Sequence, residues 1–205
     1  NATGGLVEAM VAGTPLLHFT GQTASANIGL GRGSVHDVPD QLAMLAAVSK
    51  TAYRIDDADQ ALAVITQAAR EALAPPAGPV SIELPIDVQK TLIERPVELD
   101  DITVLAIAQA APDEAALDDL AELLIAAKRP LLWLGNGARH AGAETARLME
   151  LGVGLVTSQH GRAIVPEDHP LSLGAFNLMP DVEALYGTCD LMIVAGTLTN
   201  KMAPA

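Results

Sequence analysis

The sequence predicts an α/β fold with two incomplete, doubly wound parallel-sheet units joined by an acidic linker. Two patterns predict this class. Short apolar segments alternate along the chain with segments whose apolar residues recur at helical spacing. The short segments are continuously apolar, which is typical of parallel strands that helices cover on both faces. We assign residues 1–85 to the first unit, 86–111 to the linker and 112–205 to the second unit.

The first unit begins with a helix and then alternates strand and helix. Helices are predicted at 4–12, from Pro39 to about Val48 and from Asp57 to Leu73, and strands at 16–20, 51–55 and 79–84. Gly13 and Pro15 end the first helix, and Pro39 takes the first position of the second, where proline is favoured. The segment 21–38 is predicted to be a loop because it contains several glycines.

The second unit follows a linker that has many charges and no sustained period. Its helices are predicted from Pro112 to about Ala127, at about 141–150 and from Pro180 to about Tyr186, and its strands at 131–134, 153–157 and 191–195. Each unit has fewer strands than an open sheet normally uses. Because the chain also starts at Asn1 within a helical pattern, we expect a piece of a longer protein whose open sheet edges favour association.

The amino-acid composition of the chain excludes several classes of function. The 205 residues include 12 Lys and Arg against 25 Asp and Glu, which gives a formal net charge of −13. A hydrophobic content of one half excludes a disordered chain, and the acidic balance argues against nucleic-acid binding. No apolar run is long enough to span a membrane. Cys189 is the single cysteine and cannot form an internal disulfide, so a cytoplasmic location is expected.

Three predicted strands end in residues that suit a ligand, since ligands of open α/β sheets bind beyond the carboxyl ends of the strands. At the first end, Gly21 permits a close approach and the Gln22 amide both donates and accepts hydrogen bonds. The alternative there is a surface glutamine in a loop. The other two ends are Gly135-Asn136-Gly137, followed by Arg139, and Gly196-Thr197.

The turn formed by Gly135, Asn136 and Gly137 leads into a predicted helix, and a glycine turn at a helix N-terminus suits a nucleotide phosphate. The full dinucleotide-binding pattern is missing, so a plain tight turn is the alternative. Gly196-Thr197 also follows a predicted strand and suits a phosphate for the same reason, but this pair is a less specific signal.

Histidines offer a further candidate. His36 follows a glycine-rich loop that suits folding over a ligand, and the adjacent Asp37 would hold its imidazole in one tautomer. In the alternative, Asp37 only caps the next helix. His18 lies inside an apolar strand and is expected to be a hydrogen-bonded core residue. No histidine pair has zinc-site spacing, and the sequence lacks the nucleophile elbow and the Walker phosphate loop, so neither a metal site nor a self-contained hydrolase is predicted.

Five stretches of the sequence resemble thiamine-diphosphate-dependent enzymes, such as acetolactate synthase and benzoylformate decarboxylase, in the right order. NATGGLVEA with GTPLLHFTGQ (1–9 and 13–22) and GPVSIELPIDV (78–88) resemble the second half of the pyrimidine-binding domain. PLLWLGNGARHAG (130–142), GRAIVPEDHPLSLG (161–174) and CDLMIVAG (189–196) resemble the central, Rossmann-like domain. The resemblance covers nearly the whole chain.

The resemblance implies a carboligase or decarboxylase that acts on 2-keto acids with thiamine diphosphate and Mg²⁺. It also implies a homodimer or homotetramer, because the family places the cofactor between two subunits. Gln22 matches the glutamine that faces the substrate pocket, and His36 falls near the pocket mouth. Asn1 matches the asparagine that follows a glycine–proline motif in the family, and Gly21 lies beside the same pocket.

In the central domain, the family holds FAD, ADP or no nucleotide. The residues that match this region are Gly135, Asn136, Gly137, Arg139, Gly196 and Thr197. The family's catalytic glutamate and its diphosphate–magnesium motif are expected before Asn1 and after Ala205, so we expect no catalysis by these 205 residues alone. The alternatives are a benzoylformate decarboxylase-type lyase, a non-catalytic FAD- or ADP-binding module and a purely structural fragment.

Overall fold

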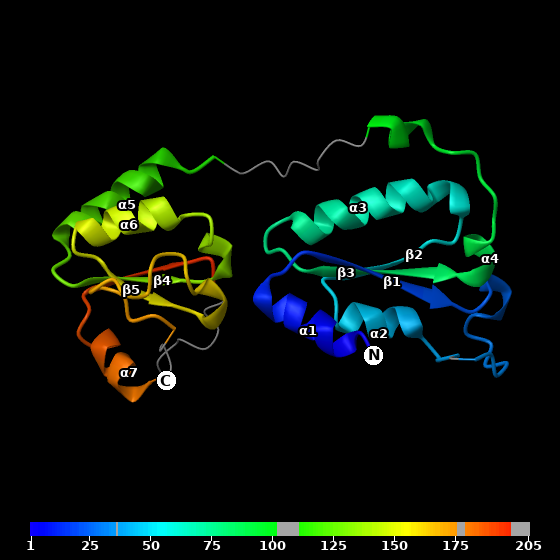
Figure 1. Ribbon diagram of the computed structural model, residues 1–205, viewed down its shortest axis with the longest axis horizontal. Coiled ribbons are helices and arrows are strands. Elements are labelled where there is room, and N and C mark those ends of the chain that lie inside the picture. The colour runs from blue at the N-terminus through cyan, green and yellow to red at the C-terminus, as the bar shows by residue number, and fades with distance from the viewer. Residues whose placement is uncertain (36, 102–110, 176–178, 198–205) are drawn as a thin grey trace. The chain divides into compact units, whose positions relative to one another are not determined.

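The computed structural model describes residues 1–35, 37–101, 111–175 and 179–197. The chain divides into two compact units, Asn1–Gln109 and Ala110–Ala205. Each unit is a three-stranded parallel sheet with helices on both faces (Figure 1). The predicted fold class is therefore confirmed.

The first unit contains every strand and helix that the sequence predicts for it. Its elements are α1 (Thr3–Ala12), β1 (Leu16–Gln22), α2 (Gln41–Ala47), β2 (Thr51–Arg54), α3 (Ala61–Leu73), β3 (Pro79–Pro85) and α4 (Ile86–Gln89). The strand order is β1-β3-β2, and α3 covers one face of the sheet while α1 and α2 cover the other (Figure 1). The short helix α4 lies in the segment predicted as linker and directly continues β3.

The end of β1 and the start of α2 differ from the prediction, and α3 begins at Ala61 rather than at Asp57. β1 continues through Gln22 because Gly21 and Gln22 pair with the last two residues of β3, so the loop starts later than expected. α2 begins at Gln41, where the Asp40 side chain accepts a hydrogen bond from the backbone N–H of Ala43 at 2.9 Å. Asp40 is thus the cap, and the expectations that Pro39 opens this helix or that Asp37 caps it are wrong.

The side chains of the central strand β3 alternate between an apolar side and a polar side. Val80 and Ile82 are fully buried and pack with α3. The alternate residues, Ser81 and Glu83, are equally buried and point to the opposite face. There Ser81 Oγ lies 3.1 Å from His18 Nδ1 and 2.6 Å from Ser49 Oγ, so His18 is hydrogen-bonded as expected, but it is half-buried rather than a core residue.

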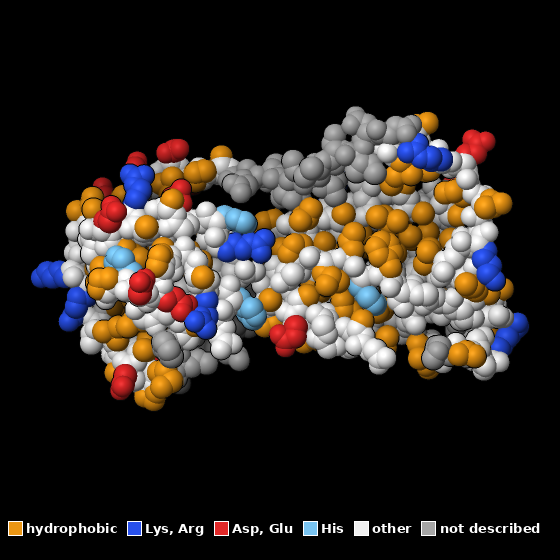
Figure 2. Space-filling model, viewed as in Figure 1, with side chains coloured by type: hydrophobic (Ala, Val, Ile, Leu, Met, Phe, Trp, Pro, Cys, Tyr) orange, Lys and Arg blue, Asp and Glu red, His pale blue; other side chains and the backbone are white. Residues whose placement is uncertain are grey.

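β1 forms one edge of this sheet. It pairs with β3 over its whole length, and no other strand of the described chain pairs with its opposite side. Leu16 and Phe19 of β1 are exposed, Phe19 by 51%. Figure 2 shows hydrophobic side chains gathered on the visible face of this unit. The expected open, apolar sheet edge is present.

The second unit also follows the predicted order of elements. These are α5 (Glu114–Ala126), β4 (Pro130–Leu134), α6 (Gly142–Glu150), β5 (Gly154–Thr157), α7 (Pro180–Tyr186) and β6 (Leu191–Ala195). The strand order is β5-β4-β6, with α5 and α6 on one face and α7 on the other (Figure 1). Among the described residues, none of the helices combines the length and hydrophobicity that crossing a membrane requires.

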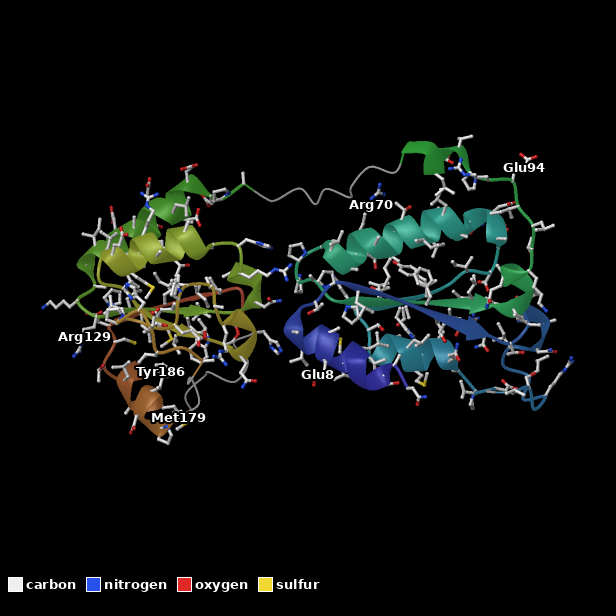
Figure 3. The ribbon with its side chains drawn as sticks, in the orientation of Figure 1. Glu8, Arg70, Glu94, Arg129, Met179 and Tyr186 are labelled. Atoms are coloured by element: carbon white, nitrogen blue, oxygen red, sulfur yellow. The ribbon has the colours of Figure 1, made fainter. Side chains whose placement is uncertain are left out.

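Both faces of the central strand β4 are apolar. Leu132 and Leu134 pack toward the cluster that includes Met149 of α6. On the other face, Trp133 packs against Tyr186 of α7, with ring centroids 5.4 Å apart. Figure 3 shows Tyr186 between α7 and the sheet, and this burial raises the pKa of Tyr186 to about 12.

Candidate functional site

An open hollow of about 720 Å³ lies at the carboxyl ends of β1 and β3 in the first unit. Its walls come from the end of β1, the loop that follows, the start of α2 and the helix α4. The lining residues are Thr20, Gly21, Gln22, Thr23, Ala24, Asn27, Ser34, Val35, Gln41, Ile86 and Gln89. This is the position at which the strand-end rule predicts a ligand, and the hollow has a volume typical of small-molecule sites.

Gln22 is anchored inside this hollow rather than free on a surface loop. Its Nε2 donates to the Glu83 carboxylate at 3.3 Å, and its Oε1 accepts from the backbone N–H of Thr23 at 2.7 Å. Glu83 itself is fully buried and forms an ion pair with Arg54, its neighbour across the β2–β3 ladder. Gln22 is therefore the last residue of β1 and part of the wall of the hollow, not a surface glutamine in a loop.

Gln41, at the first position of α2, reaches the same carboxylate. Its Nε2 donates to Glu83 at 3.0 Å and to the backbone carbonyl of Gly21 at 2.9 Å. Sequence reasoning missed Glu83, Arg54 and Gln41. A signal for Glu83 was present, because a charged residue inside the apolar strand PVSIELP is rarely buried without a partner.

The loop and helix around the hollow are fixed by hydrogen bonds. Asp87 of α4 accepts from the backbone N–H of Ser25 at 3.0 Å and from its hydroxyl at 3.1 Å. The backbone hydrogen bond from Ser25 lowers the pKa of the Asp87 carboxyl. Gln89 Nε2 donates to the carbonyl of Leu84 at 2.6 Å, which ties the other wall to β3. The hollow is thus held by contacts between segments more than sixty residues apart.

The remaining candidates of the first unit lie as follows. Gly21 lines the hollow, but a Cβ built there would be an ordinary 3.6 Å from Gln89 Nε2, so the protein itself does not require glycine. Asn1 is exposed and does not line the hollow. His36 lies outside the described residues. Its proposed partner Asp37 borders a second hollow of about 330 Å³ formed by the glycine-rich loop.

In the second unit, the glycine turn is used for packing between strand ends. A Cβ on Gly135 would lie 2.2 Å from the carbonyl oxygen of Gly196 and 2.5 Å from the Thr197 side chain. One on Gly137 would lie 2.8 Å from the Gly196 Cα. Gly196 has a left-handed φ of +66°, and a Cβ there would meet the backbone nitrogen of Ala138 at 2.3 Å. Glycine is therefore required at all three positions.

The backbone amides of this turn also have partners within the protein. Gly135 N–H donates to Ala195 at 2.9 Å, and Gly137 N–H donates to Gly196 at 2.9 Å. The neighbouring Asn136 is half-buried, and Arg139 is exposed with its Nε 3.0 Å from His140 Nε2. These contacts match the tight-turn alternative, because a phosphate cradle needs N–H groups that the protein has not already used. No group of three His, Cys, Asp or Glu side chains suited to a metal occurs in the described part of the chain.

Comparison with known proteins supports the resemblance seen in the sequence. Residues 117–204 match the family described as thiamine pyrophosphate enzyme, central domain. The chain is 32% identical to the probable 2-ketoarginine decarboxylase of Pseudomonas aeruginosa over 96% of its own length and 35% of the relative's. It is 29% identical to the acetolactate synthase isozyme 1 large subunit of Escherichia coli, over 99% of its own length and 36% of the relative's.

A solved structure agrees with these relatives. The thiamine diphosphate-dependent 4-hydroxybenzoylformate decarboxylase of Rhodococcus jostii superposes with a TM-score of 0.79 at 25% identity, over 94% of this chain and 37% of that one. The chain therefore spans about a third of the length of the proteins it matches. The family match, the sequence identity and the structural superposition agree, and the chain belongs to the thiamine-diphosphate-dependent enzyme family.

Proposed function

We propose that this chain is part of a carboligase or decarboxylase for 2-keto acids of the acetolactate synthase kind, with the hollow of the first unit at its reaction site. The observation that carries the proposal is Gln22, which lines the hollow at the end of β1 and is tied to the buried Glu83. The relatives support the reaction class, since their names describe acetolactate synthesis and 2-keto acid decarboxylation. The proposal includes a homodimeric or homotetrameric assembly and a cytoplasmic location.

The hollow suits the uncharged part of thiamine diphosphate or of a substrate. Its lining residues carry amides and hydroxyls but neither a Lys or Arg for a diphosphate nor a carboxylate for Mg²⁺. We therefore place neither the diphosphate nor Mg²⁺ on these lining residues. When bound, the cofactor supplies a carbanion and an electron sink for the keto carbon. The residues of this chain bind and orient the organic groups and limit the access of water.

An aryl-specific lyase of the benzoylformate decarboxylase type is the weaker candidate. Among the described residues, no aromatic side chain lines the hollow. An aryl substrate gains much of its affinity from ring stacking, whereas a small aliphatic 2-keto acid does not need it. We do not extend the proposal to FAD or ADP in the second unit, because the amides of Gly135 and Gly137 already donate to backbone carbonyls.

The test is turnover by the enzyme that carries this chain, with thiamine diphosphate, Mg²⁺ and a panel of 2-keto acids that includes pyruvate and benzoylformate. Release of CO₂ from an aliphatic 2-keto acid is the expected result. Gln22→Ala should lower kcat/KM about tenfold, the value of roughly one lost hydrogen bond, with little change in melting temperature.

Gln67→Ala is the matched control. Gln67 is an exposed glutamine on α3 whose Nε2 donates to Tyr53 and Glu71, outside the hollow. Its replacement should leave kcat/KM unchanged. Absence of CO₂ release from every 2-keto acid would overturn the proposed function, and equal kinetics of Gln22→Ala and the parent would remove Gln22 from the site.

A further inference from the structure

Three glutamines line the hollow, and each donates a side-chain N–H to an acceptor inside the protein. Gln22 donates to Glu83, Gln41 to Glu83 and the Gly21 carbonyl, and Gln89 to the Leu84 carbonyl. A primary amide has two N–H donors and one oxygen. Both donors of Gln41 are therefore committed, and Oε1 is the one polar side-chain atom that it can offer to a ligand.

Glu83 makes this orientation of the amides obligatory. Its carboxylate is fully buried and accepts hydrogen bonds from Gln22, Gln41 and Arg54. If the Gln41 amide turned over, its oxygen would face the carboxylate and the Gly21 carbonyl, two acceptors without a proton between them. Leaving a buried acceptor unpaired costs about 1–3 kcal/mol, so the amide stays as it is.

The hollow consequently presents the Gln41 Oε1 as an acceptor on an uncharged wall, whereas Gln22 Oε1 already accepts from the backbone N–H of Thr23. None of its lining residues is charged, so a carboxylate finds no cationic partner there. Val35 and Ile86 add apolar surface that suits a methylene chain. Asn27 has the reverse orientation, because its Oδ1 accepts from Arg32 at 3.2 Å, so the acceptor character is that of Gln41 at the start of α2.

We propose that Glu83 is a positioning residue that holds Gln41 with its Oε1 as a hydrogen-bond acceptor, so that the hollow selects a 2-keto acid whose side chain ends in a guanidinium or ammonium group. Such a group brings several N–H donors on a methylene stem, and its bonds to amide oxygens are charge-assisted. A neutral alkyl side chain would offer that oxygen no donor, which is the basis of the discrimination. This inference rests on the proposed function.

The first experiment measures binding without catalysis. Titration calorimetry compares a guanidinoalkyl carboxylic acid with an alkyl carboxylic acid of the same length, on the enzyme that carries this chain and without cofactor. The guanidino compound should bind at least about tenfold more tightly, and Gln41→Met should abolish that difference. Equal binding of the two compounds to the parent protein would overturn the inference, whether or not any 2-keto acid is turned over.

The second experiment measures the ratio of kcat/KM for a guanidino 2-keto acid to that for its alkyl counterpart. Glu83→Gln replaces one carboxylate oxygen by an NH2 group, so Arg54 on one side and Gln22 with Gln41 on the other no longer both have an acceptor. Weaker positioning of the Gln41 amide should lower this ratio about tenfold. Gln41→Met removes the acceptor with a smaller change to the interior, and it keeps the test decisive if Glu83→Gln does not fold. Gln67→Met is the matched control and should leave the ratio unchanged.

The outcomes separate this inference from the proposed function. CO₂ release with an unchanged ratio in folded Gln41→Met would overturn the inference and leave the proposed function intact. A higher requirement for thiamine diphosphate with no change in ratio would assign the acceptors to the cofactor and likewise overturn it. No CO₂ release from any 2-keto acid would overturn the proposed function, and the calorimetric comparison then decides the inference by itself.

Discussion

The two units have the same architecture and opposite chemistry at the carboxyl ends of their central strands. β3 ends near the buried Glu83, whose partners come from β1, β2 and α2, and an open hollow lies beside them. β4 is followed by Gly135, where Gly196 and Thr197 after β6 pack so closely that no Cβ fits. The first strand end leaves space for a ligand, and the second is filled by the protein's own backbone.

The difference shows what a ligand site needs beyond a promising sequence. A glycine turn before a helix predicts a phosphate site only if its N–H groups are free, and those of Gly135 and Gly137 donate to the end of β6. A glutamine at a strand end is a weaker signal in sequence, yet Gln22 lies in a hollow. Whether a strand end can bind a ligand depends on which of its polar atoms have no hydrogen-bond partner within the protein. That depends on contacts between residues distant in the sequence.

The largest expected effect is a loss of stability when a substitution disrupts the packing at the strand end of the second unit. Gly196→Ala places a Cβ 2.3 Å from the Ala138 nitrogen in a left-handed backbone conformation, so the unit should lose about 4 kcal/mol of unfolding free energy. Trp133 is the single tryptophan, so its fluorescence during urea unfolding reports on this unit. Gly187→Ala is the control, because its Cβ would meet nothing closer than 3.5 Å. Equal midpoints for both variants would contradict the packing argument.

A second effect concerns the polar strand end of the first unit. Glu83→Ala leaves the Arg54 guanidinium and the amides of Gln22 and Gln41 without their shared acceptor, which should cost about 3 kcal/mol. Circular dichroism should show a lower midpoint for the first unit, while the Trp133 transition stays in place. A shift of the Trp133 transition would show that the two units do not unfold independently.

The smallest effect is a pH dependence confined to the first unit. Burial lowers the pKa of His18 below its ordinary 6.5, so the folded state prefers the neutral imidazole. The unfolded chain takes up a proton as the pH falls below about 6.5, and the stability of this unit should decrease from there down to the folded pKa. Above pH 7 the contribution is fully present. Urea unfolding at pH 7.5 and 5.5 measures it, and His18→Gln should remove the difference between those two values.

Local patterns were sufficient for most elements of the fold. α7 and β6 begin and end at the predicted residues, because Pro180 and the apolar run 191–195 mark them clearly. The end of β1 was misplaced, since only the pairing of Gly21 and Gln22 with β3 keeps those residues in the strand. The start of α2 was misplaced because Asp40 competes with Pro39 as the helix signal.

The candidate site was only partly accessible from the sequence. Gln22 could be predicted as a site residue because it follows the end of a predicted strand and because it matches a glutamine of the family. Arg54, Glu83 and Gln41 meet through the pairing of β2 with β3 and the docking of α2, which no local pattern specifies. The roles of His36, Asn1 and the residues of the glycine turn in binding stay predictions.

The open edge of β1 has a practical consequence for work with these 205 residues. Leu16–Gln22 exposes a row of backbone donors and acceptors beside the apolar Leu16 and Phe19, which is a template onto which another extended chain can add. β1 is thus one strand at which aggregation during expression or storage can begin. A single gatekeeper charge, Phe19→Lys, is the smallest change that addresses it, because it places an ammonium on that edge without disturbing the hollow.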